Sequence, residues 1–158
     1  MLQIGENAPG FKLHSADGGL VELSSFKGKN VVLLFFPLAN TGVCTKELCS
    51  FRDGLARYNS LNAQVLAVSV DSPFSLKLWK EQQKFNFPLL SDFNKETIAK
   101  YDAMYETFVP GELDFHGVAK RSAFVIDKSG ILQYVEVLEN AGDEPNYEKI
   151  TAALEKLQ

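Results

Sequence analysis

The sequence predicts an α/β protein in which helices cover both faces of a mixed β-sheet. Three observations favour this class. Strand-like apolar runs alternate with helical periodicities through most of the chain. The runs at 30–36 and 64–70 are almost wholly apolar, which is typical of strands that are buried on both faces. A hairpin pattern and an amphipathic helix close the chain.

The first half of the chain predicts a strand extension followed by a buried strand and a helix. The expected elements are strands at 11–14, 20–23, 30–36 and 64–70 and a helix at 44–58. Asp17-Gly18-Gly19 supplies the turn between the first two strands. Pro37 ends the buried strand because it has no N–H for the ladder. Leu48, Phe51 and Leu55 follow at helical spacing.

The second half predicts three helices, a hairpin and one irregular segment. The expected elements are helices at 73–85, 94–101 and 145–157, a short apolar piece between Pro88 and Asp92, a loop at 103–118, and strands at 121–126 and 131–137. Ser72-Pro73 is a helix start, because serine caps and proline suits the first turn. Asp127-Lys128-Ser129-Gly130 is the turn of the hairpin.

Size and composition indicate one globular domain over residues 1–158. A chain of 158 residues buries a sizeable core, and 46% hydrophobic with 23% charged residues is ordinary for such a protein. The net charge of −4 and the lack of a basic stripe argue against nucleic-acid binding. The longest apolar run, 31–38, is too short to span a bilayer, and we expect no secretory signal.

Cys44 lies where a helix is expected to begin. Thr41-Gly42 before it offers a turn and a helix cap. A thiol in the first turn of a helix meets unpaired backbone N–H groups and the positive end of the helix dipole. Both favour the thiolate, which is the nucleophilic form of cysteine. Ionisation alone supplies at most about thirty-fold more nucleophile, so a fast reaction also needs groups that stabilise its transition state.

The pattern Pro37-x-x-x-Thr41-x-x-Cys44 resembles the active-site signature of the peroxiredoxins, which are thiol peroxidases with a thioredoxin-like fold. Further segments resemble that family in the same order: 4–13, 68–72, 87–92 and 120–130. The resemblance covers nearly the whole chain. It implies a thioredoxin-like fold and a Cys44 thiolate that reduces hydrogen peroxide or organic hydroperoxides.

The resemblance also implies roles for the residues around Cys44. Arg121 supplies a guanidinium that stabilises the thiolate and contacts the peroxide. Pro37 shields the sulfur from water, and Glu47 holds Arg121 in place. Thr41 can supply a hydroxyl three residues before Cys44. Each has a simpler interpretation from the residues alone: a helix cap for Thr41, a strand terminator for Pro37, a solvated helix face for Glu47 and a surface strand residue for Arg121.

Cys49 is a candidate resolving cysteine. Five residues along an intact helix separate its α-carbon from that of Cys44 by roughly 8–9 Å, beyond the approximately 7 Å that a disulfide tolerates. The first helical turns would therefore unwind before the two sulfurs bond. The bacterioferritin-comigratory (Q-type) branch has a resolving cysteine at this spacing. The sequence of residues 35–44, however, is closer to that of the one-cysteine alkyl hydroperoxide reductase E branch. We expect Cys49 to resolve Cys44; a buried apolar cysteine is the alternative.

The expected partners are a hydroperoxide and a thiol reductant such as thioredoxin. We expect no metal or other cofactor, because His14 and His116 lie far apart and two cysteines five apart do not match zinc spacing. Two cysteines without further pairs favour a reducing compartment, the cytoplasm. Members of the family commonly dimerise, so a homodimer is compatible with the resemblance. A one-cysteine enzyme with an external thiol, and a redox sensor without fast turnover, are the alternative functions.

Overall fold

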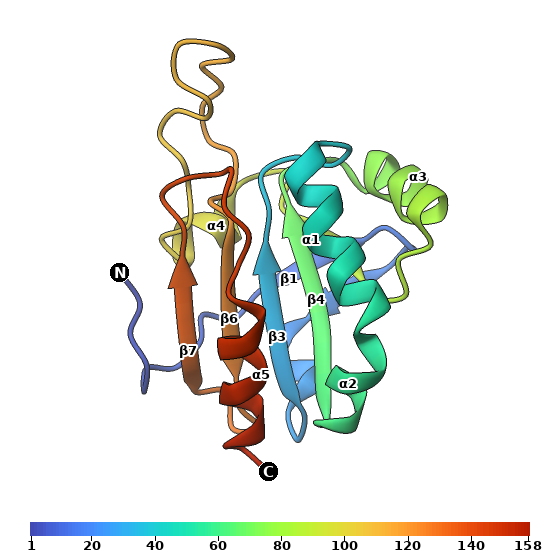
Figure 1. Ribbon diagram of the computed structural model, residues 1–158, viewed down its shortest axis with the longest axis vertical. Helices are drawn as coiled ribbons and strands as arrows, with labels where there is room; N and C mark the ends of the chain where they lie inside the picture. Colours follow the sequence, from blue (N-terminus) through green and yellow to red (C-terminus); the bar gives the residue numbers. More distant parts are fainter.

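One seven-stranded mixed sheet runs through the computed structural model, which describes residues 1–158 (Figure 1). The strands are β1 (Lys12–Ser15), β2 (Leu20–Glu22), β3 (Asn30–Phe35), β4 (Ala63–Ser69), β5 (Leu89–Ser91), β6 (Ser122–Ile126) and β7 (Leu132–Val137). The helices are α1 (Gly42–Asp53), α2 (Leu55–Ser60), α3 (Pro73–Gln83), α4 (Glu96–Lys100) and α5 (Tyr147–Glu155), with a 3₁₀ turn, η1, at Leu23–Phe26.

The sheet is parallel at its centre and antiparallel at both sides. Its strand order is β2-β1-β5-β4-β3-β6-β7. The β3–β4 and β4–β5 pairs are parallel, whereas β6 and β7 on one side and β1 and β2 on the other run antiparallel. All six residues of β3 are buried, as their apolar composition predicts. The mixed sheet with an N-terminal strand extension is therefore confirmed.

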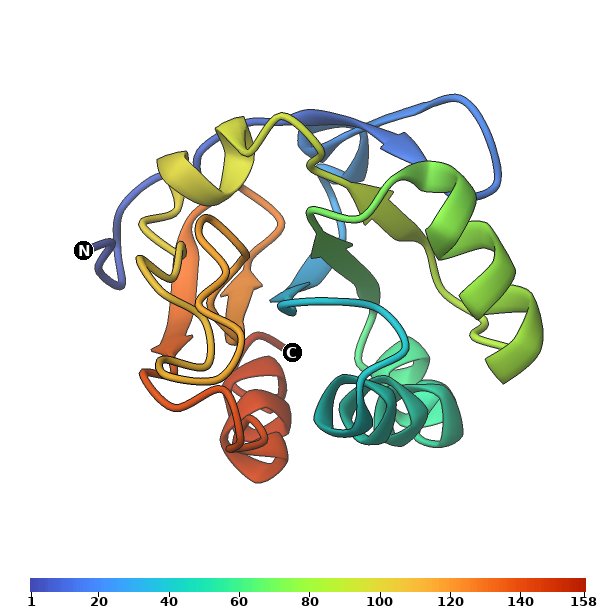
Figure 2. The same ribbon diagram turned by 90° about the horizontal axis from the view of Figure 1, so that it is seen from above.

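Helices cover both faces of this sheet, and each face has its own apolar core. Figure 2 shows α1, α2 and α5 together on one side and α4 on the other. The core under α1, α3 and α5 includes Phe51, Trp79 and Leu154. The core on the opposite face includes Phe35 and Tyr101, whose ring centroids are 5.2 Å apart. No helix has the length and apolarity needed to cross a membrane.

The helix predicted at 44–58 is wrong in one respect, because it is two helices. Gly54 separates α1 from α2. Glycine weakens a helix interior by roughly 1 kcal/mol relative to alanine, which favours a break at this position. The start is also earlier than predicted, at Gly42. Tyr58 on α2 packs against Phe51 on α1, with ring centroids 5.0 Å apart.

Capping residues determine where two other helices begin. The Ser72 side chain accepts a hydrogen bond from the Ser75 N–H, and Pro73 opens α3, as predicted. The last helix begins at Tyr147 instead of 145, because the Asn146 side chain caps it. The predicted loop at 103–118 projects from the body (Figure 1) and is closed by backbone hydrogen bonds between Phe108 and Phe115.

The register of the central strands brings three segments of the chain to one edge of the sheet. Phe35, the last residue of β3, pairs with Val68 near the carboxyl end of the parallel strand β4. On its other side Phe35 pairs with Ser122, the first residue of the antiparallel strand β6. Arg121 precedes Ser122 directly. The helix that follows β3, the loop that follows β4 and the Arg121 side chain therefore meet at this edge.

We predict that Phe51→Ala destabilises the protein by about 3–5 kcal/mol, the usual cost of emptying a buried aromatic site. Phe51 is fully buried and its ring lies within 5.5 Å of the Tyr147 ring centroid, so it joins α1 to α5. Urea unfolding measures the loss. The matched control is Phe74→Ala, because Phe74 is 83% exposed and its truncation leaves no cavity. Equal effects of the two substitutions would contradict this account of the core.

Candidate active site

Cys44 is a buried thiol in the first turn of α1. Its side chain is 1% exposed, and it lies two residues after the first residue of the helix. The chain reaches this point from strand β3. The pairing with β4 extends one residue past β3, because Phe36 donates its N–H to the Val68 carbonyl. Unpaired N–H groups of the helix start favour a negative charge here. Both cysteines of the chain are free thiols.

Arg121 reaches the thiol from the opposite side. Its Nη2 donates to the Cys44 Sγ at 3.3 Å and to the Ala141 carbonyl at 3.0 Å. Its Nε also donates to the Ala141 carbonyl, at 3.2 Å. The side chain is only 2% exposed. Burial works against the charged form, but the negative charges of Cys44 and Glu47 outweigh it and raise the pKa of the Arg121 guanidinium.

Glu47 completes the cluster from the next turn of α1. Its Oε1 accepts a hydrogen bond from the Arg121 Nη1 at 2.7 Å, and none of its side chain is exposed. The solvated interpretation of Glu47 is therefore wrong. Its Oε2 is buried without a hydrogen-bond partner. Burial raises the pKa of Glu47 to about 7, although Arg121 lowers it by charge and by hydrogen bonding.

Pro37 and Thr41 lie in the loop that leads into α1. Pro37 is buried at the end of β3. Thr41 occupies the N-cap position of α1, but its side chain makes no cap hydrogen bond. Its hydroxyl instead donates to the Leu38 carbonyl at 2.7 Å. Thr41 therefore takes the predicted cap position, but the loop turns its hydroxyl towards its own backbone. With its proton engaged, the hydroxyl oxygen is left as an acceptor.

Asp71 fixes this loop and was not identified from the sequence. Its Oδ2 accepts from the Ala39 N–H at 2.8 Å and from the Ser69 hydroxyl at 2.6 Å. The signal that points to Asp71 is its position directly after the carboxyl end of β4, at the same edge of the sheet as the end of β3. A polar residue at that edge is a candidate for positioning the neighbouring loop.

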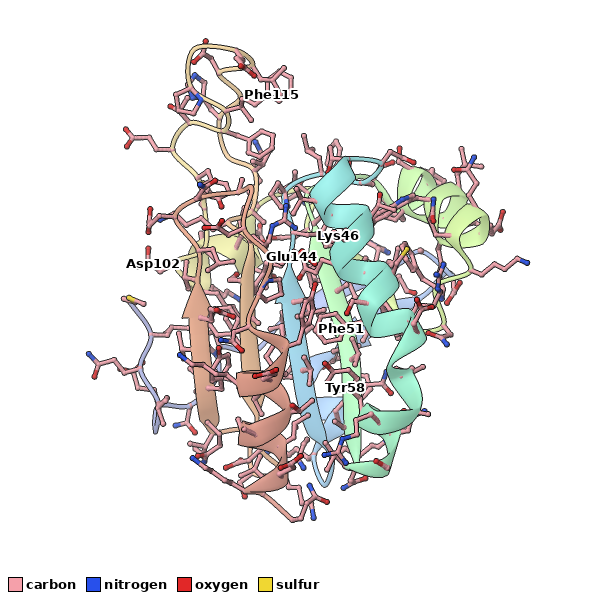
Figure 3. All side chains as sticks on the ribbon, in the orientation of Figure 1. Lys46, Phe51, Tyr58, Asp102, Phe115 and Glu144 are labelled. Carbon is pink, nitrogen blue, oxygen red and sulfur yellow. The ribbon has the colours of Figure 1, made fainter.

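The segment 138–146, between β7 and α5, lies against the other side of the site. Besides the Ala141 carbonyl on Arg121, it supplies Glu144, which pairs with Lys46 of α1 at 3.1 Å (Figure 3). Glu144 also accepts from the Tyr147 hydroxyl at 2.8 Å. Hydrogen bonding to Tyr147 is the main cause that lowers the pKa of Glu144. No sequence motif marks this segment as part of the site. Its position becomes clear only from the path of the folded chain.

Cys49 lies two residues beyond Glu47 in α1 and contacts a different helix. It is partly buried, and its Sγ is 3.8 Å from the Gln83 Oε1 at the end of α3. Arg52 donates to the backbone carbonyl of Gln83 at 2.6 Å. Because both cysteines belong to the intact helix α1, the helical rise keeps their α-carbons too far apart for a disulfide in this conformation.

The six candidate residues therefore lie in three places. Cys44, Glu47 and Arg121 form one buried, hydrogen-bonded cluster. Pro37 and Thr41 lie in the adjoining loop, and Cys49 of α1 contacts Gln83 at the end of α3 instead. No group of three or more His, Cys, Asp or Glu side chains is arranged to hold a metal ion. A buried thiol with a guanidinium and helix N–H groups around it suits nucleophilic attack with build-up of negative charge.

Residues 4–135 match the AhpC/TSA family. The chain belongs to this family of peroxiredoxins. The AhpC/TSA match spans the strand extension, Cys44 and Arg121. As a peroxiredoxin, the protein is a thiol peroxidase, an enzyme that takes a hydroperoxide substrate and a thiol reductant.

Curated relatives of this peroxiredoxin include both branches suggested by the sequence. Alkyl hydroperoxide reductase E of Mycobacterium tuberculosis is 40% identical over 140 residues, which cover 87% of this chain and 86% of the relative. The chloroplastic peroxiredoxin Q of Oryza sativa subsp. japonica is 37% identical over 131 residues, which cover 83% of this chain and 57% of the relative.

Solved peroxiredoxin structures share the fold. Peroxidoxin BcpB of Mycobacterium tuberculosis superposes with a TM-score of 0.86 at 28% identity, and the match covers 100% of this chain and 99% of that one. Peroxiredoxin Q of Xanthomonas campestris gives a TM-score of 0.80 at 27% identity over 92% of this chain and 90% of that one. The thioredoxin-like fold expected from the resemblance is confirmed.

The buried Glu47 predicts a pH-dependent stability. Between its usual pKa of 4.5 and the folded value of about 7, the unfolded chain loses the proton while the folded protein keeps it. Folding therefore weakens as the pH rises through this window, and the contribution is constant above it. The interval corresponds to about 3 kcal/mol. Urea unfolding of the reduced protein and of its Glu47→Gln variant at several pH values measures the difference, and a difference independent of pH would contradict the assignment.

Proposed function

We propose that Cys44 is the peroxidatic cysteine of this peroxiredoxin and that Cys49 resolves it. In this cycle Arg121, Thr41 and Pro37 build the peroxide site, and Glu47 holds Arg121. The observation that supports the proposal best is the Arg121 guanidinium, which donates to both the Cys44 Sγ and the Glu47 carboxyl in a buried cluster. A buried cation that touches a thiol stabilises its thiolate, the reactive form.

The surroundings of Cys44 suit an in-line attack on a hydroperoxide. The thiolate attacks one peroxide oxygen, the O–O bond breaks and negative charge builds on the departing oxygen. Arg121 supplies the donors for that charge. The Thr41 hydroxyl, whose proton is engaged by the Leu38 carbonyl, is left to accept the hydroperoxide O–H. The products are a Cys44 sulfenic acid and water or an alcohol.

Resolution then proceeds within one chain. The Cys49 thiol condenses with the Cys44 sulfenic acid, which releases water and forms the disulfide. The first turns of α1 unwind for this step, since the intact helix keeps the sulfurs apart. A dithiol protein such as thioredoxin reduces the disulfide by exchange and restores both thiols. A reducing compartment such as the cytoplasm suits this cycle.

A one-cysteine cycle is the second candidate, and the position of Cys49 favours it. The Cys49 thiol is engaged by the Gln83 side chain at the end of α3 rather than directed at Cys44. If α1 stays helical after oxidation, an external thiol reduces the sulfenic acid instead. A peroxide sensor that is oxidised without fast turnover remains the alternative outside the enzyme class.

Intact mass separates these candidates. Reduced protein is mixed with one equivalent of hydrogen peroxide for a few seconds, and free thiols are then trapped. A fast loss of two hydrogens with both thiols blocked to the trap is the expected result. The matched control is Cys49→Ser, which stops at a gain of one oxygen. A gain of one oxygen in the parent protein, with Cys49 still trapped, would establish the one-cysteine cycle, and an unchanged mass would overturn the proposal.

We predict that Arg121→Lys slows the oxidation of Cys44 by roughly 10²–10³-fold, the usual effect of removing one donor from an oxyanion site. Lysine keeps the positive charge but lacks the fork that serves Cys44, Glu47 and the Ala141 carbonyl together. Stopped-flow measurement of the second-order rate with hydrogen peroxide gives the effect. Arg57→Lys on the exposed face of α2 is the control. An unchanged rate in Arg121→Lys would remove Arg121 from the site.

A further inference from the structure

A single guanidinium serves two acidic groups in the buried cluster. Arg121 donates to the Cys44 Sγ at 3.3 Å and to the Glu47 Oε1 at 2.7 Å. No more than 2% of any of these three side chains is exposed. The nearest other cation on α1, Lys46, is 73% exposed and pairs with Glu144. If Cys44 and Glu47 were both ionised, the cluster would hold a net negative charge away from water.

A buried net charge is costly unless a proton neutralises it. Glu47 has a place for that proton, because its Oε2 is buried and has no hydrogen-bond partner. The other groups that face Glu47 do not favour its ionisation: Glu144 of the segment 138–146 and Glu136 of β7 are negative. Tyr147 of α5 is also close enough to feel its charge, and it is neutral at physiological pH.

The titration of Glu47 agrees with this geometry. Desolvation raises the pKa of Glu47 to about 7 even with Arg121 beside it. With Cys44 as the thiolate that the proposed function requires, the cluster then consists of that thiolate, the Arg121 cation and a neutral Glu47. Oxidation removes the negative charge from the sulfur, because the sulfenic acid is neutral. The cation is then left with one acidic group, and ionised Glu47 becomes the favoured form.

The peroxidase step has a matching need for a proton. Attack of a thiolate on a hydroperoxide yields a sulfenic acid and a hydroxide or alkoxide, and the latter takes up one proton to leave as water or an alcohol. In balanced form, Cys44–S⁻, ROOH and one H⁺ give Cys44–SOH and ROH. The sulfur is oxidised and the peroxide oxygen is reduced, so no further oxidant or reductant is required.

We propose that Glu47 supplies this proton: it is protonated while Cys44 is a thiolate, and it ionises as Cys44 becomes a sulfenic acid. The inference rests on the proposed role of Cys44. Glu47 then acts in the reaction as well as holding Arg121. After the reaction the Arg121 guanidinium passes from the thiolate to the Glu47 carboxylate, which keeps the cluster neutral in both states.

Proton counting tests the proposal. A Cys49→Ser protein, which stops at the sulfenic acid, is mixed with hydrogen peroxide in weak buffer with a pH indicator, at about one pH unit below the Glu47 pKa of about 7, where most of Glu47 is protonated. The ultraviolet absorbance of the thiolate verifies that Cys44 is ionised before mixing. With Glu47 in place we expect a net uptake from solution near zero per sulfenic acid formed. In Cys49→Ser/Glu47→Gln we expect an uptake of about one proton, because glutamine has none to give.

Any other pattern overturns the proposal. Uptake of one proton in both proteins means that the solvent is the source. No uptake in either protein means that the sulfur product stays ionised and Glu47 does not change. If Glu47→Gln does not fold, infrared difference spectra of Cys49→Ser before and after oxidation test the proposal instead. The proposal requires that the carbonyl band of the protonated Glu47 carboxyl disappear on oxidation. Absence of a sulfenic acid in the trapped mass would instead reject the role of Cys44 itself.

Discussion

The buried guanidinium of Arg121 is the constraint on which the site depends. A cation with only 2% of its side chain exposed has to be satisfied by protein groups, because burial without partners costs several kcal/mol. Its partners come from two distant segments: Cys44 and Glu47 on α1, and the Ala141 carbonyl before α5. The antiparallel pairing of β6 with β3 brings Arg121 to this point. The register of the sheet therefore determines which groups meet in the site.

The two ends of helix α1 differ in how firmly they are packed: the C-terminal half is held by buried aromatic contacts, and the first turn has few stabilising features. Phe51 in its second half is fully buried and packs on Tyr58 and Tyr147. The start has glycine as its first residue and no side-chain cap, and the pair of Lys46 with Glu144 is largely exposed. Exposed ion pairs contribute about 0–1 kcal/mol. Local unwinding at Cys44 can thus occur while the rest of the helix stays packed, which is what an intrachain disulfide with Cys49 needs.

The sequence predicted the site in outline because its parts are short motifs. Proline at a strand end, threonine in a turn and cysteine at a helix start are local features, and Arg121 and Glu47 followed from the family resemblance. The single helix at 44–58 was wrong, whereas Thr41 takes the predicted N-cap position without a side-chain cap hydrogen bond. Gly54 divides the predicted helix, and the Thr41 hydroxyl donates to the Leu38 carbonyl within a loop that Asp71 fixes.

By itself the sequence determined the α/β class, the buried strand β3 and the placement of Cys44 at a helix start, since these depend on apolar periodicity and on chain stiffness over a few residues. Only the tertiary structure decided that Glu47 is buried with an unpartnered oxygen, and that Asp71, Ala141 and Glu144 surround the site. Burial and charge pairing depend on distant residues: Arg121 and Cys44, for example, are 77 positions apart. The apolar periodicity of one segment carries no information about its contacts with distant segments.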